Sequence, residues 1–395
     1  MAKTQQLPIN PAVLQWARKT AGLSITQVAQ ALEVKTDFIL AIESGHRKPS
    51  KTLLRNLARL YMRPFTVLLL PNPPKEESLP TDYRSLPVPK QAIGPQTAQA
   101  LRESRRLQQV LSDIAYDNPN ILPVFEPSAV SKEDTPSKVA LQIRKAVNVD
   151  VDEQKKWYGA RNAFRAWRGE LQRIGILVVV EGFPREEARG FSLWHPELIP
   201  TIVVSRNEAP AAQIFTLFHE LAHIFLRSDA MCLKQESSTP LGSIEAWCNR
   251  VAAAVLIPEN ELLGLVSKAA IKEWSPDALY QIASRFKVSR HVAAIRLEEV
   301  GLVSKGFYNR IKEQLAPDDY TTITKTPKTK GEGEYKRDTP RERLAEVGYL
   351  AANAVLEACK NSILTTTEAA DLLRVRPSKF NRLHSLASSQ SQRYG

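Results

Sequence analysis

A single apolar helix that carries two histidines and a glutamate constrains this chain more than any other feature. The segment 214–225 reads IFTLFHELAHIF. Its apolar residues recur at helical spacing, so we expect the helix to be buried along most of its length. His219 and His223 are four residues apart and therefore share one face of it. Because unsatisfied polar groups are costly in a core, the fold that buries this helix must give both imidazoles partners.

The pattern of these polar residues is typical of a catalytic metal site. Two imidazoles at positions i and i+4 can bind one ion, and Glu220, turned by about 100° around the helix, can lie beside the ion without binding it. Zinc at such a site acidifies a bound water, and the glutamate accepts its proton and delivers it to the leaving amine. We therefore predict a zinc hydrolase with Glu220 as its base. The alternative is two core histidines whose hydrogen-bond partners are backbone groups or carboxylates. In that case Glu220 would be a third buried polar group that needs hydrogen-bond partners.

A catalytic zinc needs a third protein ligand and an open fourth position. Asp229 follows His223 by six residues, the spacing of HExxHxxGxxH/D enzymes, but Leu226 stands where those enzymes have glycine. Glu245 begins a second amphipathic helix that would pack against the first. We favour Glu245 as the third ligand, oriented by Asn249 one turn further along, and keep Asp229 as the alternative.

Chain length, Pro-rich segments and charged segments indicate several domains. The chain has 395 residues, of which 43% are hydrophobic, and a net charge of +12. A Pro-rich segment at 71–90 separates an all-helical first part from the remainder. β-branched runs after Ile174 read as strands, and the charged segment 311–340 reads as a second linker. The short apolar runs and three cysteines without a disulfide or metal pattern predict a cytoplasmic protein with no membrane contact.

Positive charge is concentrated in residues 1–70. They contain ten Lys and Arg and three Asp and Glu, which leaves +7 in under a fifth of the chain. Clustered positive charge on a small helical domain is the electrostatic footprint of nucleic-acid binding. A well-solvated basic surface is the alternative that charge alone leaves open.

The HELAH motif and the segment IEAWCNRVAAAVLIP at 244–258 together resemble the ImmA/IrrE family of zinc metallopeptidases. Members carry an acid three residues before an Ala-Asn pair, where this chain has Cys248 in place of the alanine. The resemblance spans about residues 155–300. It implies a zincin-like peptidase domain, with both histidines and Glu245 as ligands of Zn²⁺ and Glu220 as the base.

Residues 21–50, AGLSITQVAQALEVKTDFILAIESGHRKPS, resemble the Xre-type helix-turn-helix of phage repressors. The resemblance implies a recognition helix from about Lys35 to Ser44, after a turn at Glu33 and Val34. In such domains the start of the recognition helix meets base edges, and flanking basic residues meet phosphates. The implied DNA contacts are Lys35, Thr36, Asp37, Arg47, Lys48 and Lys51. A helical domain kept for protein contacts is the alternative.

DYRSLP, just after the Pro-rich segment, resembles a motif of proteins that fuse this repressor-type domain to this peptidase. We therefore expect an α+β, mainly helical protein with a small sheet. Within its last part, 364–383 has helix-turn-helix rhythm, and we expect a packing module there before a second DNA reader. The expected parts are an Xre-type helix-turn-helix domain at 1–70, a linker at 71–90, a metallopeptidase domain with a helical N-terminal part at 91–310, a charged linker at 311–340 and a C-terminal helical module at 341–395.

These expectations combine into a zinc endopeptidase and transcriptional regulator that binds DNA. The family resemblance implies a protein substrate, either a repressor or a toxin–antitoxin component, cleaved in a stress or mobile-element response. Repressor-type domains usually act as dimers, so a homodimer is possible. The alternatives are a DNA-binding repressor or antitoxin with a structural or inactive zinc site, and a hydrolase of a non-peptide substrate. Glu220 argues against the first, because a structural site has no use for it.

Two further features of the peptidase remain open at the level of sequence. A substrate segment is expected to add to a sheet edge, at the strand around Phe191 or the strand around Val203. A donor that stabilises the oxyanion is also expected. Its candidates are His195 and Tyr158.

Overall fold

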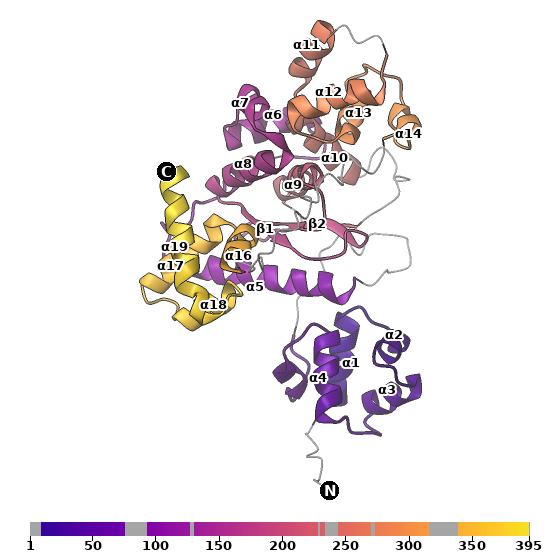
Figure 1. Ribbon diagram of the computed structural model, residues 1–395, viewed down its shortest axis with the longest axis vertical. Coiled ribbons are helices and arrows are strands. Elements are labelled where there is room, and N and C mark those ends of the chain that lie inside the picture. Colours follow the sequence, from indigo (N-terminus) through magenta and orange to yellow (C-terminus); the bar gives the residue numbers. More distant parts are fainter. Residues whose placement is uncertain are drawn as a thin grey trace, which may run out of the picture.

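The computed structural model describes residues 9–75, 93–126, 130–227, 230–233, 244–269, 273–315 and 339–394. This part of the chain is mainly helical and contains one four-stranded sheet (Figure 1). The expected α+β class is therefore confirmed. None of the helices among the described residues has the length and apolar character needed to span a bilayer.

The N-terminal domain is a bundle of short helices around its own apolar core. Asn10 caps the first helix, since its side chain accepts a hydrogen bond from the backbone N–H of Ala12 (2.9 Å) and Pro11 follows at the first helical position. Leu14, Val28 and Ile39 are among the core residues that join the helices. The elements are α1 (Pro11–Thr20), α2 (Ile25–Ala31), α3 (Thr36–Glu43), α4 (Lys51–Leu60) and the 3₁₀ helix η1 (Phe65–Leu69).

The sheet lies at the centre of the larger part of the molecule. Its strands are β1 (Leu177–Glu181), β2 (Ala188–Leu193), β3 (Thr201–Ser205) and β4 (Ala230–Leu233), in the order β1-β3-β2-β4. β1 and β3 are parallel, and β2 is antiparallel to both β3 and β4. Every residue of β1 and β3 is buried, as expected of strands that are covered on both faces.

Alternate residues of the strands enter two separate cores. Val178 and Val204 pack with one group of helices, α6 (Pro136–Val147), α8 (Gly159–Arg173), α9 (Pro210–Phe225) and α10 (Ile244–Leu256). Val179 and Val203 pack on the opposite face with α5 (Pro95–Asp117), α16 (Thr339–Val347), α17 (Tyr349–Lys360), α18 (Thr366–Leu372) and α19 (Pro377–Tyr394). The C-terminal helices are thus one wall of the sheet's second core.

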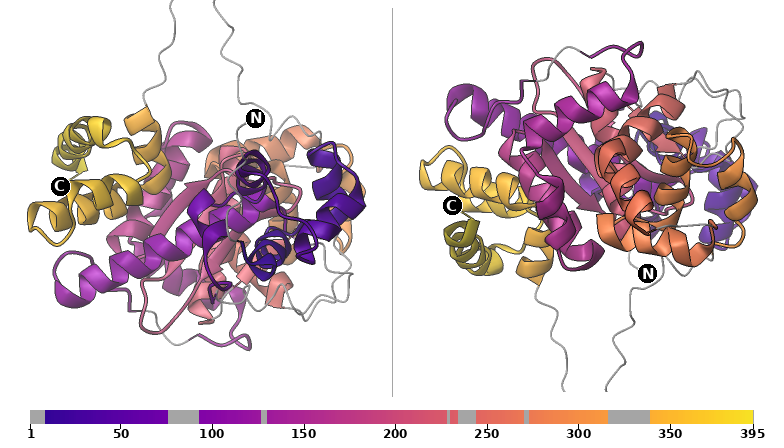
Figure 2. Two further views of the ribbon diagram at one scale, coloured as in Figure 1. Left: turned by 90° about the horizontal axis from the view of Figure 1, so that it is seen from below. Right: turned by 90° about the horizontal axis from the view of Figure 1, so that it is seen from above.

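The remaining helices extend the first core beyond α10. They are α7 (Val151–Lys156), α11 (Glu259–Ala269), α12 (Pro276–Phe286), α13 (Arg290–Glu299) and α14 (Phe307–Ile311). Arg296 of α13 is buried and donates a hydrogen bond from Nε to the carbonyl of Ile257, just after α10 (2.9 Å). Figure 2 shows α12–α14, in orange, on the side of the sheet region away from α17–α19, in yellow.

Candidate metal centre and nucleic-acid interface

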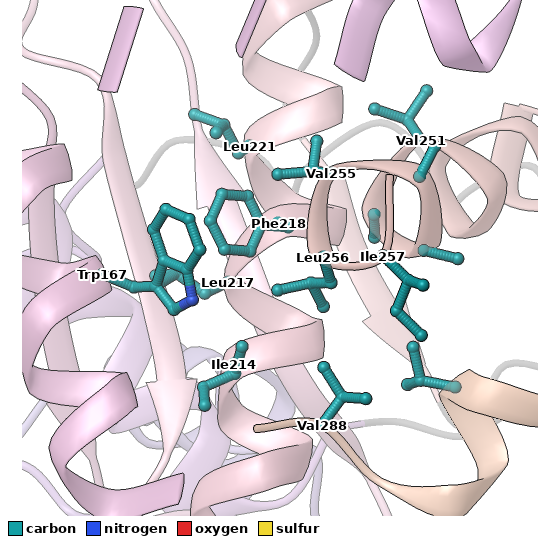
Figure 3. Close-up of a cluster of buried hydrophobic side chains, with 14 of the residues drawn as sticks. Trp167, Ile214, Leu217, Phe218, Leu221, Val251, Val255, Leu256, Ile257 and Val288 are labelled. Atoms are coloured by element: carbon teal, nitrogen blue, oxygen red, sulfur yellow. The ribbon is translucent and has the colours of Figure 1, made fainter. Parts of the chain in front are cut away.

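Helix α9 is buried along almost all of its length. It begins with Pro210 at its first position and packs between the sheet and helices α8 and α10. Phe218 meets Trp167 of α8 edge to face at 4.8 Å, and Leu221 and Val255 extend this contact toward α10 (Figure 3). Since aromatic packing fixes the rotation of α9, its polar residues face α10 and β2 in defined positions.

His219, His223 and Glu245 converge on one point between α9 and α10. The two imidazole Nε2 atoms are 3.2 Å apart, and the Glu245 carboxylate lies 3.2 Å from Nε2 of His219 and 3.3 Å from Nε2 of His223. His219 is 5% exposed and His223 is fully buried, whereas the Glu245 side chain is 35% exposed. The cluster therefore opens to solvent on the side of the carboxylate.

The spacing of these donors fits a zinc ion. With Zn–N and Zn–O bonds of about 2.0–2.2 Å, neighbouring ligands of a tetrahedral site lie about 3.3 Å apart. The three distances between the donor atoms are 3.2, 3.2 and 3.3 Å. Two imidazoles and a carboxylate are also the donor set of catalytic zinc sites that keep a fourth position open. These residues can therefore hold zinc.

The electrostatics of the cluster show why the carboxylate is ionised. Burial lowers the pKa of His219, but the hydrogen bond to Glu245 and the charge of that carboxylate outweigh burial, so the pKa of His219 is raised. Burial likewise raises the pKa of Glu245, but its hydrogen bonds to both histidines reverse this effect and leave the pKa of Glu245 far below its usual value. An anionic carboxylate is the form that binds a cation.

Asn249 fixes the orientation of His219. Its side-chain oxygen lies 2.9 Å from Nδ1 of His219, one helical turn along α10 from Glu245. An Nδ1–H donated to this oxygen leaves Nε2 with a lone pair directed at the cluster. The sequence led us to expect that Asn249 orients Glu245. It holds the histidine instead, because α10 brings its side chain under the imidazole of α9.

Glu220 is fully buried beside β2. A Cβ placed on Gly190 would lie 3.5 Å from Oε1 of Glu220, but only 2.5 Å from Cγ2 of Thr216 and 2.8 Å from the carbonyl oxygen of Val203. Gly190 thus lets α9 approach the sheet closely at the level of the glutamate. Our sequence analysis did not single out this residue, although an isolated glycine within a strand is a signal of close approach.

Two of the other peptidase candidates, Tyr158 and His195, are exposed and belong to neither α9 nor α10. Asp229 lies outside the described residues. Tyr158 precedes α8 and is 89% exposed. His195 is exposed in the turn after β2, where its Nδ1 accepts a hydrogen bond from the backbone N–H of Glu197 (3.2 Å).

The two strands that we expected at a sheet edge are interior strands. Phe191 belongs to β2, which pairs with β3 and β4, and Val203 belongs to β3, which pairs with β1 and β2. The expectation was wrong because a strand's own residues do not specify its neighbours. Within the described part of the chain, the edge strands are β1 and β4.

The residues that we expected at DNA share one region of the N-terminal domain. Lys35 precedes α3, Thr36 and Asp37 form its first turn, and all three side chains are exposed. The flanking basic residues are exposed as well, and they are Arg47, Lys48 and Lys51.

A buried ion pair fixes the position of α3. Arg18 of α1 binds Glu43 through two hydrogen bonds, Nε to Oε1 at 2.7 Å and Nη2 to Oε2 at 2.9 Å. The turn before α3 contains Glu33 in a left-handed conformation with φ 54°, at the position where the repressor-type family often has glycine. The two helices therefore meet through the turn that a helix-turn-helix requires.

Comparison with protein families supports both halves of this description. Residues 171–298 match the IrrE N-terminal-like domain (Peptidase_M78). Residues 12–66 match a helix-turn-helix domain. The resemblance to a fusion of these two kinds of domain is thereby confirmed.

No curated relative matches the chain. Among solved structures, a Mycobacterium tuberculosis transcriptional regulator is similar over 48% of this chain and 51% of its own length, with 15% identity and a TM-score of 0.28. The chain thus spans about half the length of that regulator, and so distant a likeness says nothing about function.

Proposed function

We propose that this chain, which joins a helix-turn-helix domain to an IrrE N-terminal-like domain, is a zinc endopeptidase and transcriptional regulator. The observation that carries the proposal is the convergence of His219, His223 and Glu245 on one point, with Glu220 buried next to them. When bound by these residues, zinc supplies a Lewis acid for the scissile carbonyl and a more acidic water. Both promote hydrolysis of a peptide bond.

Glu220 is the general base of the proposed reaction. It follows His219 in the chain, and Gly190 leaves room for its carboxylate between α9 and β2. Its carboxylate takes a proton from the attacking water and returns it to the leaving amine. Asn249 keeps His219 in the tautomer whose Nε2 would bind the metal and holds the imidazole in one orientation.

The substrate enters as an extended segment beside β4. The other edge strand, β1, is occupied, because the carbonyl of Val178 accepts hydrogen bonds from Nε (3.0 Å) and Nη2 (2.6 Å) of Arg168. β4 pairs with β2, the strand of Gly190, and lies against α9. A segment that pairs with β4 would therefore extend the sheet on the side of β2 and Gly190.

The partner of the peptidase is a regulatory protein. The chain joins a DNA-binding type of domain to a peptidase-family domain. This combination favours a substrate that itself regulates transcription, either a repressor or a toxin–antitoxin component. In this proposal it acts in the cytoplasm, in a stress or mobile-element response, and its N-terminal domain binds an operator as a homodimer. The residues proposed at DNA are those of the exposed region around α3.

Replacement of Glu220 by Gln separates peptidase from a purely DNA-binding role. Each protein encoded beside the gene is co-expressed with wild type, Glu220→Gln or Glu197→Gln, an exposed acid in the turn after β2. New termini are read by mass spectrometry, and zinc is measured in each purified chain. We expect Glu220→Gln to keep zinc and to lose cleavage by about 10²–10⁴-fold, since only the proton transfer is removed. Glu197→Gln should cleave like wild type.

Two outcomes would contradict the proposal. Wild-type rates in Glu220→Gln would show that this carboxylate is not the base. If wild-type protein leaves every neighbouring gene product intact, the alternative gains, namely a DNA-binding repressor or antitoxin with a structural or inactive zinc site.

A further inference from the structure

The C-terminal module repeats the turn that joins the two helices of the N-terminal helix-turn-helix. Helices α2 and α18 have seven residues each, and each begins with a capping box, formed by Ser24 with Gln27 and by Thr365 with Glu368. In both units the next helix starts twelve residues after the cap, since α3 begins at residue 36 and α19 at residue 377.

The backbone of the two turns is also the same. Arg374 has φ 52°, in the position where the N-terminal unit has Glu33 with φ 54°. The N–H of the following valine donates to a carbonyl five residues earlier at 2.9 Å in both units, and these valines are Val34 and Val375. The segment 365–380 therefore shares the cap spacing and the turn backbone of the N-terminal unit.

The same turn elsewhere in the chain shows that this geometry alone does not produce a DNA-binding unit. Between α12 and α13, Lys287 has φ 61°, and Val288 N–H donates to the carbonyl of Ala283 at 3.0 Å. Here, however, the second helix is covered, because Ser289 and Val292 are buried and α13 packs against α10. This copy serves packing, so exposure and charge of the second helix must decide the role of the C-terminal copy.

The second helix of the C-terminal unit faces solvent with basic residues. One side of α19 is buried in the sheet's second core through Phe380 and Leu383. The other side carries exposed residues at and just after the start of the helix, which are Arg376, Ser378, Lys379, Asn381 and Arg382. No Asp or Glu occurs in α19, whereas α3 contains Asp37 and Glu43. The surface of α19 is therefore complementary to a polyanion.

Ion pairs hold this unit on the body of the protein and neutralise nearby acids. Arg374, in the turn, pairs with Glu181 at the end of β1. Asp371 of α18 pairs with Arg106 of α5 at 2.6 Å. Both ribbon views place α17–α19 at the periphery, on the side away from α12–α14 (Figures 1 and 2). A rigid, exposed unit of this kind can present α19 to a duplex without rearrangement.

We propose that α18 and α19 form a second DNA reader, with the start of α19 in the major groove of a duplex. Ser378, Lys379 and Arg382 lie where base edges would be met, and Arg376 lies where a phosphate would be met. From the sequence we expected a packing module here before a second DNA-binding unit, and the proposal adopts the second interpretation. This proposal does not depend on the metal site, and two DNA readers would let one chain bind two segments of an operator region.

Charge reversal on α19 tests the proposal in the full-length chain. The test variant is Lys379→Glu/Arg382→Glu, and the matched control is Lys132→Glu/Lys145→Glu, two exposed lysines in the body of the protein with the same change of charge. Each is made in wild type and in Arg47→Glu/Lys48→Glu, which removes contacts of the N-terminal domain. Binding to a fluorescent mixed-sequence duplex is measured by anisotropy over a range of salt.

In the Arg47→Glu/Lys48→Glu background we expect residual, salt-dependent binding. The α19 variant should weaken this binding by about tenfold or more and reduce the salt slope, because two cations that face the polyanion are lost. The lysine control should do neither, and Lys379→Ala/Arg382→Ala should weaken binding in the same direction with unchanged thermal unfolding. Equal affinities and slopes for the α19 variant and the lysine control in both backgrounds would overturn the proposal. If Arg47→Glu/Lys48→Glu alone leaves DNA affinity unchanged, the proposed DNA contacts of the N-terminal domain are wrong, but the proposal for α19 is unaffected.

Discussion

At the scale of single residues, the proposed zinc site depends on a side chain that would not touch the ion. Asn249 holds Nδ1 of His219 at 2.9 Å, and it belongs to the same helix as Glu245. One turn of α10 therefore supplies both a carboxylate ligand and the residue that orients an imidazole. Loss of Glu245 would reduce the number of ligands. Loss of Asn249 would leave the number unchanged but would remove the preorganisation of His219.

Replacement of Asn249 by Ala should weaken zinc binding without removing a ligand. We expect a loss of about 10–100-fold in affinity, because Nδ1–H of His219 loses its acceptor and the ring loses its orientation. Competition with a chromophoric chelator measures the affinity. Asn249→Asp, which keeps an acceptor at the same place, should bind at least as well as wild type, and equal affinities for wild type and Asn249→Ala would refute the role of the amide.

A methyl group at Gly190 should disturb the contact between β2 and α9. The added Cβ would lie 2.5 Å from Thr216 and 2.8 Å from the Val203 carbonyl, so the strand or the helix must shift. We expect a lower free energy of unfolding by about 1–3 kcal/mol, measured with urea. Gly169→Ala in α8 is the matched control, since nothing lies within 4 Å of its added Cβ and alanine favours a helix. A similar effect of both substitutions would count against the close approach.

At the scale of helices and strands, local patterns identified elements well and neighbours poorly. The helical spacing of 214–225 and the β-branched run TIVVS correctly predicted α9 and β3. The order of the strands was out of reach, because an all-apolar strand only indicates burial on both faces and not which strands flank it. Likewise, no local signal connects α5 with α16, although both cover the same face of the sheet.

The contact that Arg296 of α13 makes just after α10, together with its partner Glu299, leads to a prediction about stability and pH. Arg296 bonds the carbonyl that follows α10, and its Nη1 lies 3.2 Å from the Glu299 carboxylate. Burial raises the pKa of Glu299 to about 7, although Arg296 opposes the shift. A carboxyl with a raised folded-state pKa stabilises the fold fully below its unfolded value of 4.5 and loses this contribution as pH rises toward 7.

Glu299→Gln should therefore flatten the pH dependence of stability. In wild type, the free energy of unfolding should fall by up to about 3 kcal/mol relative to Glu299→Gln as pH rises from 4.5 to 7. Urea unfolding at several pH values measures the difference. The exposed-site variant Glu197→Gln should follow wild type, and parallel curves for wild type and Glu299→Gln would show that Glu299 titrates normally.

At the scale of the whole molecule, the two faces of the sheet pack against helices with different proposed roles. One face packs on α9, whose inner side carries the proposed zinc ligands, and the other face packs on the C-terminal helices. The proposed DNA-binding helices α3 and α19 belong to separate cores. Residues of α9 could be assigned from sequence because HExxH is a local pattern, whereas the role of α19 required its exposed side to be known.

Metal analysis tests the central claim, a zinc ion held by two imidazoles of α9 and one carboxylate of α10, most directly. Purified wild type, His219→Ala, Glu245→Ala and Glu197→Gln are loaded with zinc, dialysed and measured by mass spectrometry of the metal and the intact chain. We predict a single tightly bound zinc ion in wild type and Glu197→Gln, and its loss from both ligand variants. Wild-type zinc content in Glu245→Ala, or no bound zinc in the wild-type chain, would contradict this account.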